Sequence, residues 1–222
     1  MPPQTSSAHW DDRFSGSDFF YGLEPGPVAR RAEKYHRSLR ALSSSALSSS
    51  ALSSSALDQG CGEGQDLAFL AACGYQCTGL DFSMHARRKA RSLLGEQNLQ
   101  AQVLEADLSL WQPERTWDLV LSINVLPFVG ESADFALAQA LHAVAAGGVL
   151  GLSVWAREDA RSPALAEGVR LWAREEIEAA LEESGTWQRL EVALLQQYFS
   201  GEDGVPCLRA RPFVTVVAQR LK

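Results

Sequence analysis

The sequence predicts an α/β protein with a doubly wound, mostly parallel sheet that closes with an antiparallel hairpin. Strand-like and helix-like segments alternate from residue 56 to residue 183, which is typical of a parallel sheet covered by helices on both faces. The last two strand-like segments, residues 189–198 and 212–220, have no helical segment between them, so we expect them to pair directly. One reversed strand therefore follows the parallel part of the sheet.

The alternation is organised around a glycine-rich stretch at residues 56–64. It reads Ala-Leu-Asp-Gln-Gly-Cys-Gly-Glu-Gly, and a helical segment follows at once. Two apolar residues and an acid that lead into three alternate glycines predict a strand, a tight turn and a helix. Glycines permit positive φ there and let a ligand approach the backbone. Gln65 stands where the dinucleotide pattern G-x-G-x-x-G requires its third glycine, which argues against a nicotinamide site.

Hydrophobic patterns and end signals give the remaining core elements in order. After a helix at residues 66–72, Gly74 is a plausible helix stop, and Ser83 can cap the next helix. The expected strands are residues 75–80, 102–106, 118–123 and 149–155, and the expected helices are residues 83–94, 134–145 and 172–183. The strand at 118–123 has the apolar run of a buried parallel strand.

Residues 1–40 are interpreted as an N-terminal flap and a helix. A short helix is expected to begin at residue 9, and an aromatic loop covers residues 19–26. So many aromatic residues ahead of the core indicate either a flap over the glycine turn or ordinary packing against the domain. The helix at residues 28–40 carries a basic face, which is typical of a solvated surface.

Residues 41–55 consist of three Ala-Leu-Ser-Ser-Ser units. A period of five matches neither the helical nor the strand repeat, so no single face collects the leucines. Low-complexity serine favours solvated coil, and the segment is interpreted as a linker. The predicted organisation is a flap and helix at 1–40, a linker at 41–55 and the main domain at 56–222.

Composition narrows the function classes. The 222 residues, 46% of them hydrophobic, can bury one substantial core. A net charge of −7 argues against nucleic acid or an anionic membrane as a partner, and no apolar run approaches a membrane span. The N-terminus lacks the regions of a signal peptide. Cys61, Cys73, Cys77 and Cys207 show no metal-ligand spacing, so we expect reduced thiols, no metal, and a cytoplasmic protein that acts on a small molecule.

Four segments resemble motifs of the class I S-adenosylmethionine (SAM)-dependent methyltransferases. They are residues 58–64, residues 79–83 (Gly-Leu-Asp-Phe-Ser), residues 106–108 (Ala-Asp-Leu) and residues 117–120 (Trp-Asp-Leu-Val). The resemblance covers residues 56–155, and Gln59 departs from it because an apolar residue is usual at that position. It implies a seven-stranded Rossmann-like sheet, methyltransferase activity and SAM as the methyl donor.

In such a sheet the ligand lies at the carboxyl ends of the strands. The resemblance places the glycine turn beneath the aminoacyl part of SAM and Asp81 at the ribose hydroxyls. It places Asp107 at the adenine amine and residues 123–126 along the methionine arm. The predicted cofactor contacts are Asp58, Gly60, Cys61, Gly62, Gly64, Asp81, Phe82, Asp107, Leu108, Asn124 and Val125.

Residues 10–14, 21–25, 125–128 and 213–220 resemble the tellurite-resistance methyltransferases, neighbours of the thiopurine methyltransferases. That family tends to carry a histidine and arginines between its last two strands. Here arginines stand there, but no histidine follows His142. The implied acceptor is small and soft or anionic: a thiol, a thiopurine, or a selenium or tellurium oxyanion. The candidate acceptor contacts are Trp10, Tyr21, Arg209 and Arg211, and no catalytic base is predicted.

Two other functions remain open from the sequence. One is a SAM-binding sensor or partner protein without turnover, and the other is a nicotinamide oxidoreductase of the same fold. The pattern specifies neither the oligomeric state nor a role for the serine repeat.

Overall fold

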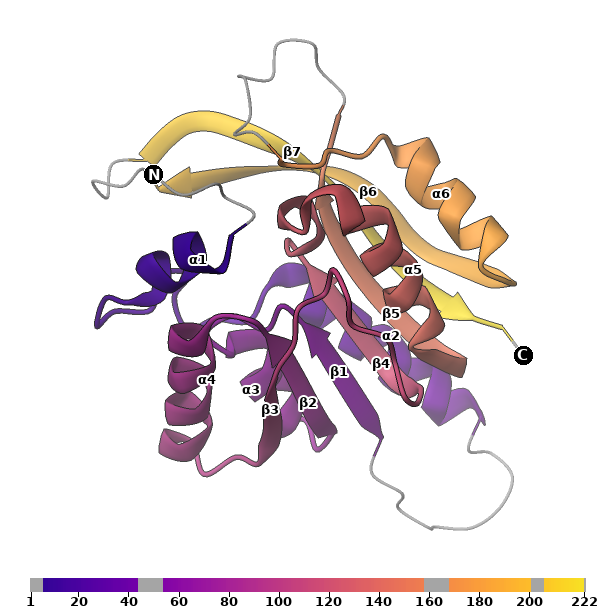
Figure 1. Cartoon of the computed structure of the whole chain (residues 1–222). Helices are drawn as coiled ribbons and strands as arrows, with labels where there is room; N and C mark the ends of the chain where they lie inside the picture. The colour runs from indigo at the N-terminus through magenta and orange to yellow at the C-terminus, as the bar shows by residue number, and fades with distance from the viewer. Residues whose placement is uncertain (1–5, 44–53, 158–167, 201–205, 222) are drawn as a thin grey trace.

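The computed structural model describes residues 6–43, 54–157, 168–200 and 206–221 (Figure 1). Within these residues seven strands form one sheet in the order β3-β2-β1-β4-β5-β7-β6. Its strands are β1 (Ser55–Gln59), β2 (Gln76–Asp81), β3 (Ala101–Glu105), β4 (Trp117–Ile123), β5 (Val144–Trp155), β6 (Trp187–Ser200) and β7 (Pro206–Arg220). Strands β1 to β5 pair in parallel, and β7 is antiparallel to both β5 and β6. The predicted mostly parallel sheet with a closing hairpin is confirmed.

Helices cover both faces of the sheet, as a doubly wound fold requires. The helices are α1 (Ser7–Phe14), α2 (Pro27–Ser43), α3 (Gln65–Ala72), α4 (Met84–Glu96), α5 (Ala133–His142) and α6 (Arg174–Glu183), with short 3-10 turns η1 (Leu126–Phe128) and η2 (Gly130–Ser132). In Figure 1, α5 lies on the near side of the sheet and α2 on the far side. Helix α4 begins at the predicted cap, where the Ser83 side chain accepts a hydrogen bond from the Ala86 N–H at 3.2 Å.

The two faces form separate apolar cores. On β4, Leu119 and Leu121 pack toward α2, α3 and α4, whereas Val120 packs toward α5 and α6. All three side chains are fully buried. This alternation follows from the two-residue period of a strand, and burial on both sides explains why the strand is apolar throughout.

Several predicted element boundaries are wrong, among them the start of β7, which lies at Pro206 instead of residue 212. The helix expected to reach residue 145 ends at His142, and β5 begins at Val144 rather than at Val149. The cause is a β-bulge: Trp117 pairs with Val144 but Leu119 pairs with Val149. The helix expected from residue 172 begins at Arg174, because the backbone N–H of Trp172 donates to the Trp155 carbonyl and its side chain is buried in the core.

The flanks of the predicted linker belong to regular elements. Residues 41–43 continue α2, and Ser55 is the first residue of β1. The backbone N–H and hydroxyl of Ser55 both donate to the Asp118 carboxylate, at 2.7 and 2.9 Å. Residues 44–53, which carry most of the repeat, lie outside the described residues.

We expect removal of one repeat unit, residues 46–50, to change the thermal midpoint by less than about 4 °C, about 1 kcal/mol for a domain of this size. The linker interpretation predicts this small effect, because shortening a flexible connection changes its closure entropy only slightly. Ser55→Ala should lower the midpoint more, because a hydrogen bond to a charged group is worth about 1.5 kcal/mol or more. Scanning calorimetry of both variants and of the parent protein measures the three thermal midpoints. A larger loss in the deletion would show that the repeat supports the fold.

Candidate functional site

The glycine turn between β1 and α3 has the backbone that its sequence predicts. Gly60, Gly62 and Gly64 have φ values of 65°, 52° and 90°, all in the left-handed region. A Cβ atom on Gly60 would lie 2.3 Å from Cγ2 of Val125, so that position admits no side chain. At Gly62 the nearest atom to such a Cβ is Cζ of Phe14, at 3.9 Å. The turn therefore packs against Val125, just after β4, on one side and leaves its middle glycine open toward a cavity.

Asp81 organises this turn as well as facing the cavity. It ends β2, as expected, and its carboxylate accepts hydrogen bonds from the Gly62 N–H at 2.9 Å and the Ser83 N–H at 2.8 Å. Burial raises the pKa of the Asp81 carboxyl, although these two hydrogen bonds oppose the shift. The sequence suggested a ligand contact for Asp81 but gave no sign of this structural role.

Asp58 is the unusual group of the site. Its side chain is 3% exposed, and its Oδ2 atom has no hydrogen-bond partner among the described residues. Burial raises the pKa of Asp58 well above its ordinary value, and the neighbouring carboxylates of Asp66 and Asp81 raise it further. Asp66, in the first turn of α3, accepts a hydrogen bond from the Gly26 N–H at 2.6 Å. An unpartnered buried carboxylate beside two others favours a cationic ligand group.

The end of β3 supplies a second part of the site. Asp107 follows β3, is exposed, and accepts a hydrogen bond from the Ser109 N–H at 2.9 Å. Leu108 is buried and Phe82 is half-buried, and both line the same cavity as Asp107. The structure thus brings all three predicted residues to one wall.

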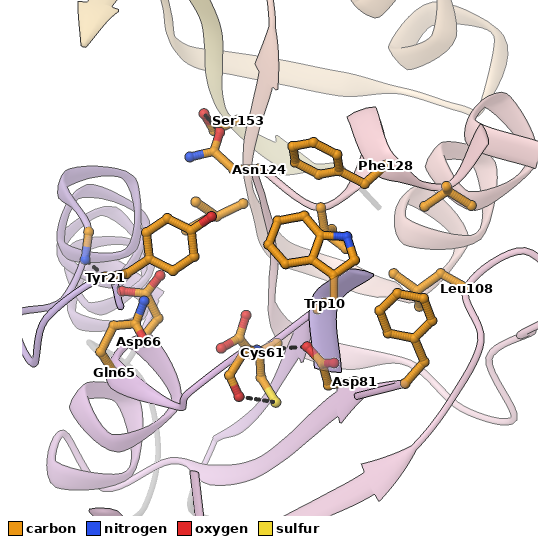
Figure 2. Close-up of a pocket in the computed structure, with 18 of the residues that line it drawn as sticks. Trp10, Tyr21, Cys61, Gln65, Asp66, Asp81, Leu108, Asn124, Phe128 and Ser153 are labelled. Carbon is orange, nitrogen blue, oxygen red and sulfur yellow. Dashed lines mark hydrogen bonds between the residues drawn. The ribbon is translucent and has the colours of Figure 1, made fainter. Parts of the chain in front are cut away.

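The end of β4 holds Asn124 in a strained conformation. Its φ is 55°, which is rare for a residue other than glycine and often marks a functional site. The Asn124 Oδ1 atom accepts a hydrogen bond from the Ser153 hydroxyl at 2.8 Å, and the Asn124 N–H donates to the Ser153 carbonyl at 2.9 Å. With Oδ1 held by β5, the amide nitrogen of Asn124 is the donor available to a ligand (Figure 2).

An aromatic group covers the cavity from the N-terminal side. Helix α1 lies beyond the carboxyl ends of β1 and β2 (Figure 1). Trp10 and Phe14 are buried, and the Trp10 ring meets Phe128 edge-on with centroids 4.8 Å apart. Tyr21 also lines the cavity. In the view of Figure 2, Trp10 and Tyr21 lie between the glycine turn and the Asn124–Ser153 pair.

These parts enclose one cavity of about 860 Å³. All predicted cofactor contacts line it except Gly64, whose position instead lies against Ala90 of α4. The described lining contains six carboxylates but no lysine, arginine or histidine; the carboxylates are those of Glu24, Asp58, Asp66, Asp81, Glu105 and Asp107. Such a wall suits a cation and disfavours a bare anion.

Arg209 and Arg211 are not placed at the cavity. Both lie on β7, where Arg211 pairs with Gln197 of β6, and their side chains are outside the described part of the chain. Phe213 and Thr215, the next residues at two-residue intervals along β7, do line the cavity. The sequence analysis missed these two, together with Ser153, Phe128 and the Glu24–Val28 backbone. Glu24, Phe128, Phe213 and Thr215 had a signal, because they stand in stretches that resemble the tellurite-resistance family.

Comparison with known proteins identifies the chemistry. Residues 56–148 match the family model described as a methyltransferase domain. Comparison with curated proteins gives no significant match. In the described residues no helix is long and apolar enough to cross a membrane, and no cluster of three or more potential metal ligands occurs.

Solved structures share the fold. TehB from Haemophilus influenzae is 16% identical with a TM-score of 0.70, over 96% of this chain and 66% of that one. The N-methyltransferase NodS from Bradyrhizobium japonicum, in complex with S-adenosylhomocysteine, is 17% identical with a TM-score of 0.65, over 99% and 100%.

A third structure, from work on the conversion of a disulfide bond into a thioacetal group during echinomycin biosynthesis, is 21% identical with a TM-score of 0.65, over 97% and 93%. At these identities the likeness establishes the fold, and the family match establishes the chemistry. Residues 56–148 therefore carry a methyltransferase domain, and S-adenosylmethionine is the cofactor that this domain implies.

Proposed function

We propose that this methyltransferase acts on a small, soft sulfur nucleophile of the thiol or thiopurine class. The observation that carries the proposal is the composition of the cavity beyond the glycine turn. There Trp10, Tyr21 and Phe128 provide aromatic walls, and the described lining contains no cation and no histidine. A planar, polarisable acceptor suits such walls.

The residues around the glycine turn fit SAM. SAM carries an ammonium, a sulfonium and a carboxylate, and it supplies an electrophilic methyl group. The unpartnered Oδ2 of Asp58 suits the ammonium, and the open backbone at Gly62 gives the ligand room. Asp81 would accept from the ribose hydroxyls with the lone pairs that its two backbone contacts leave free. Asp107 would accept from the adenine amine, with Phe82 and Leu108 against the ring.

The residues on the acceptor side of the cavity would position the acceptor rather than transfer its proton. Methyl transfer requires the nucleophile in line with the methyl group at about 3 Å, and orientation alone can supply much of the rate. Asn124 would donate its amide N–H to the acceptor, while Trp10 and Phe128 hold the acceptor plane. An oxygen or amine acceptor would need a base. A thiol with a pKa near neutrality ionises without one, so it needs no histidine, and the described lining contains none.

The deciding experiment is an S-adenosylhomocysteine release assay with a panel of thiols, thiopurines, selenite, tellurite, small amines and carboxylates. We expect turnover with aromatic or heteroaromatic thiols. Turnover with amines or carboxylates alone would refute the sulfur assignment. SAM binding without turnover over the panel would favour a sensor or partner protein.

Trp10→Leu is expected to lower kcat/KM for the thiol about tenfold or more while the Kd for SAM changes little, because the ring orients the acceptor. Calorimetry for SAM and steady-state kinetics for the thiol separate the two effects. Phe20→Leu is the matched control, since Phe20 belongs to the same aromatic segment but does not line the cavity. A parallel loss of SAM affinity in Trp10→Leu would assign the ring to the cofactor.

A second candidate acceptor is a selenium or tellurium oxyanion. Supporting it are Arg209 and Arg211, which precede the cavity-lining Phe213 on β7 by four and two positions, and the sequence resemblance to the tellurite-resistance methyltransferases. In that case Arg209→Ala or Arg211→Ala would raise the KM for the oxyanion, and lysine would replace a bidentate arginine poorly. Unchanged kinetics in both variants would leave the thiol as the acceptor.

A further inference from the structure

A buried ion pair lies beside the cavity and joins the glycine turn to the aromatic loop. Glu63 sits between Gly62 and Gly64 and is fully buried, and its Oε1 atom pairs with Nζ of Lys89 on α4 at 2.8 Å. Its Oε2 atom accepts a hydrogen bond from the Tyr21 N–H at 3.2 Å. Neither charged residue lines the cavity.

Lys89 makes a second attachment to the same loop. Its Nζ atom donates to the Asp18 carbonyl at 2.6 Å and lies 5.7 Å from the centre of the Phe19 ring. The pair therefore holds the loop backbone at residues 18 and 21, one contact from each charged group. Burying two charges is costly, and it persists only where their remaining hydrogen-bonding capacity is used.

Two aromatic side chains of this loop keep about half of their surface exposed to solvent. Phe20 is 47% exposed and Tyr21 is 46% exposed. Their rings meet edge-on with centroids 4.8 Å apart, and the Arg13 guanidinium lies 4.5 Å from the centre of the Phe20 ring. The Tyr21 side chain also contacts its neighbours, since the centre of its ring lies 6.3 Å from that of the Phe14 ring and its hydroxyl accepts a hydrogen bond from Arg13. The backbone attachments at residues 18 and 21 therefore act together with these contacts to place Tyr21 relative to the cavity.

We infer that Glu63 and Lys89 are positioning residues that hold Tyr21 over the acceptor, so that the turn beneath SAM and the wall against the acceptor form one rigid unit. The inference rests on the proposed function, in which the acceptor lies beneath Trp10 and Tyr21. Two further hydrogen bonds also join the N-terminal segment to the elements around the cavity. The Gly26 N–H donates to Asp66, and the Ser83 hydroxyl donates to Asp11 at 2.6 Å.

The test removes both charges together. Lys89→Met alone would leave the Glu63 carboxylate buried without a counter-charge, which is strongly destabilising, whereas apolar replacement of both members of a buried pair is often neutral. The double variant Glu63→Leu/Lys89→Met therefore removes both attachments. The variant Glu63→Gln/Lys89→Met keeps an acceptor for the Tyr21 N–H and loses the contacts of Lys89 with the Asp18 carbonyl and the Phe19 ring. Arg88→Met, at an exposed cation of α4, is the control.

Two measurements read the position of the loop. In Glu63→Leu/Lys89→Met we expect amide hydrogen exchange across residues 18–22 to be about tenfold faster or more, because local opening is no longer opposed by these contacts. We expect kcat/KM for the acceptor to fall about tenfold or more while the Kd for SAM stays within about threefold, since misplacement acts on orientation. Glu63→Gln/Lys89→Met should lie between this variant and the parent, and Arg88→Met should match the parent.

The inference would be overturned if amide hydrogen exchange across residues 18–22 were as slow in both double variants as in the parent protein. A rise in the Kd for SAM equal to the loss of kcat/KM would also overturn it, because it would show that the pair only shapes the cofactor turn. If Glu63→Leu/Lys89→Met does not fold, exchange at residues 18–22 in Glu63→Gln/Lys89→Met decides alone. The exchange measurement needs no acceptor, so a failure to find a thiol substrate would refute the proposed function without bearing on this pair.

Discussion

Gly60→Ala is expected to abolish measurable SAM binding and to lower the thermal midpoint. The new Cβ would lie 2.3 and 2.5 Å from Cγ2 and Cβ of Val125, distances at which the backbone itself must move. The left-handed conformation, with φ of 65°, costs a non-glycine residue about 1–2 kcal/mol, and overpacking adds about 1–3 kcal/mol. Because the turn and the end of β4 both line the cavity, the shift displaces two of its walls.

Calorimetry and thermal unfolding of Gly60→Ala measure the two effects. If SAM binding has to restore the parent conformation of the turn at a cost of about 3 kcal/mol, the Kd for SAM rises more than a hundredfold. Gly95→Ala is the matched control, because no atom lies within 4 Å of its Cβ position and α4 favours alanine over glycine. SAM affinity within threefold of the parent in Gly60→Ala would show that the turn does not hold the cofactor.

Asp58→Asn is expected to stabilise the unliganded protein at neutral pH and to weaken SAM binding. An unfolded Asp58 titrates near 3.8, whereas burial holds the pKa of the folded residue well above that value. Above pH 3.8 the folded state therefore binds more protons at this site than the unfolded state does. The contribution of Asp58 to the free energy of unfolding therefore falls as the pH rises toward and through the pKa of the folded residue. Asparagine does not titrate, so the Asp58→Asn variant does not lose this free energy.

The measurement is the thermal midpoint of both proteins from pH 4 to pH 8, with calorimetric SAM titrations at pH 8. The stability advantage of Asp58→Asn should grow with pH across this window. The loss of SAM affinity should be about tenfold or more, since a hydrogen bond between charged groups is worth roughly 1.5–3 kcal/mol. A variant that is less stable at pH 8, or that binds SAM as the parent does, would contradict the assignment of Asp58 to the ammonium.

Local patterns were sufficient for the parts of the site that lie within one strand–turn–helix unit. The three glycines have the positive φ values that their spacing predicted, and Asp81 ends its strand as expected. These features depend on residues only a few positions apart, whose geometry is restricted by sterics alone. Asp58, Asp81 and Asp107 converge because parallel strands present their carboxyl ends at one edge.

Two strand and helix starts could not be predicted because their causes are nonlocal. The start of β5 depends on a bulge opposite Trp117. Helix α6 begins late because Trp172 pairs with Ala156, directly after β5, and donates its N–H to the Trp155 carbonyl. In each case hydrogen bonds to a distant strand override the local helical pattern. The same holds for Arg209 and Arg211, whose relation to the cavity depends on how far the β6–β7 hairpin extends past β5.

The sequence by itself determined the fold class, the glycine turn and the acids at the strand ends, because each follows from short-range periodicity and backbone sterics. Only the tertiary structure decided which residues complete the site. Glu63 meets Tyr21 across 42 positions and Asn124 meets Ser153 across 29. Such contacts exist because the chain crosses the sheet and returns, and the residues at either end carry no local signal of the partner that the packing gives them.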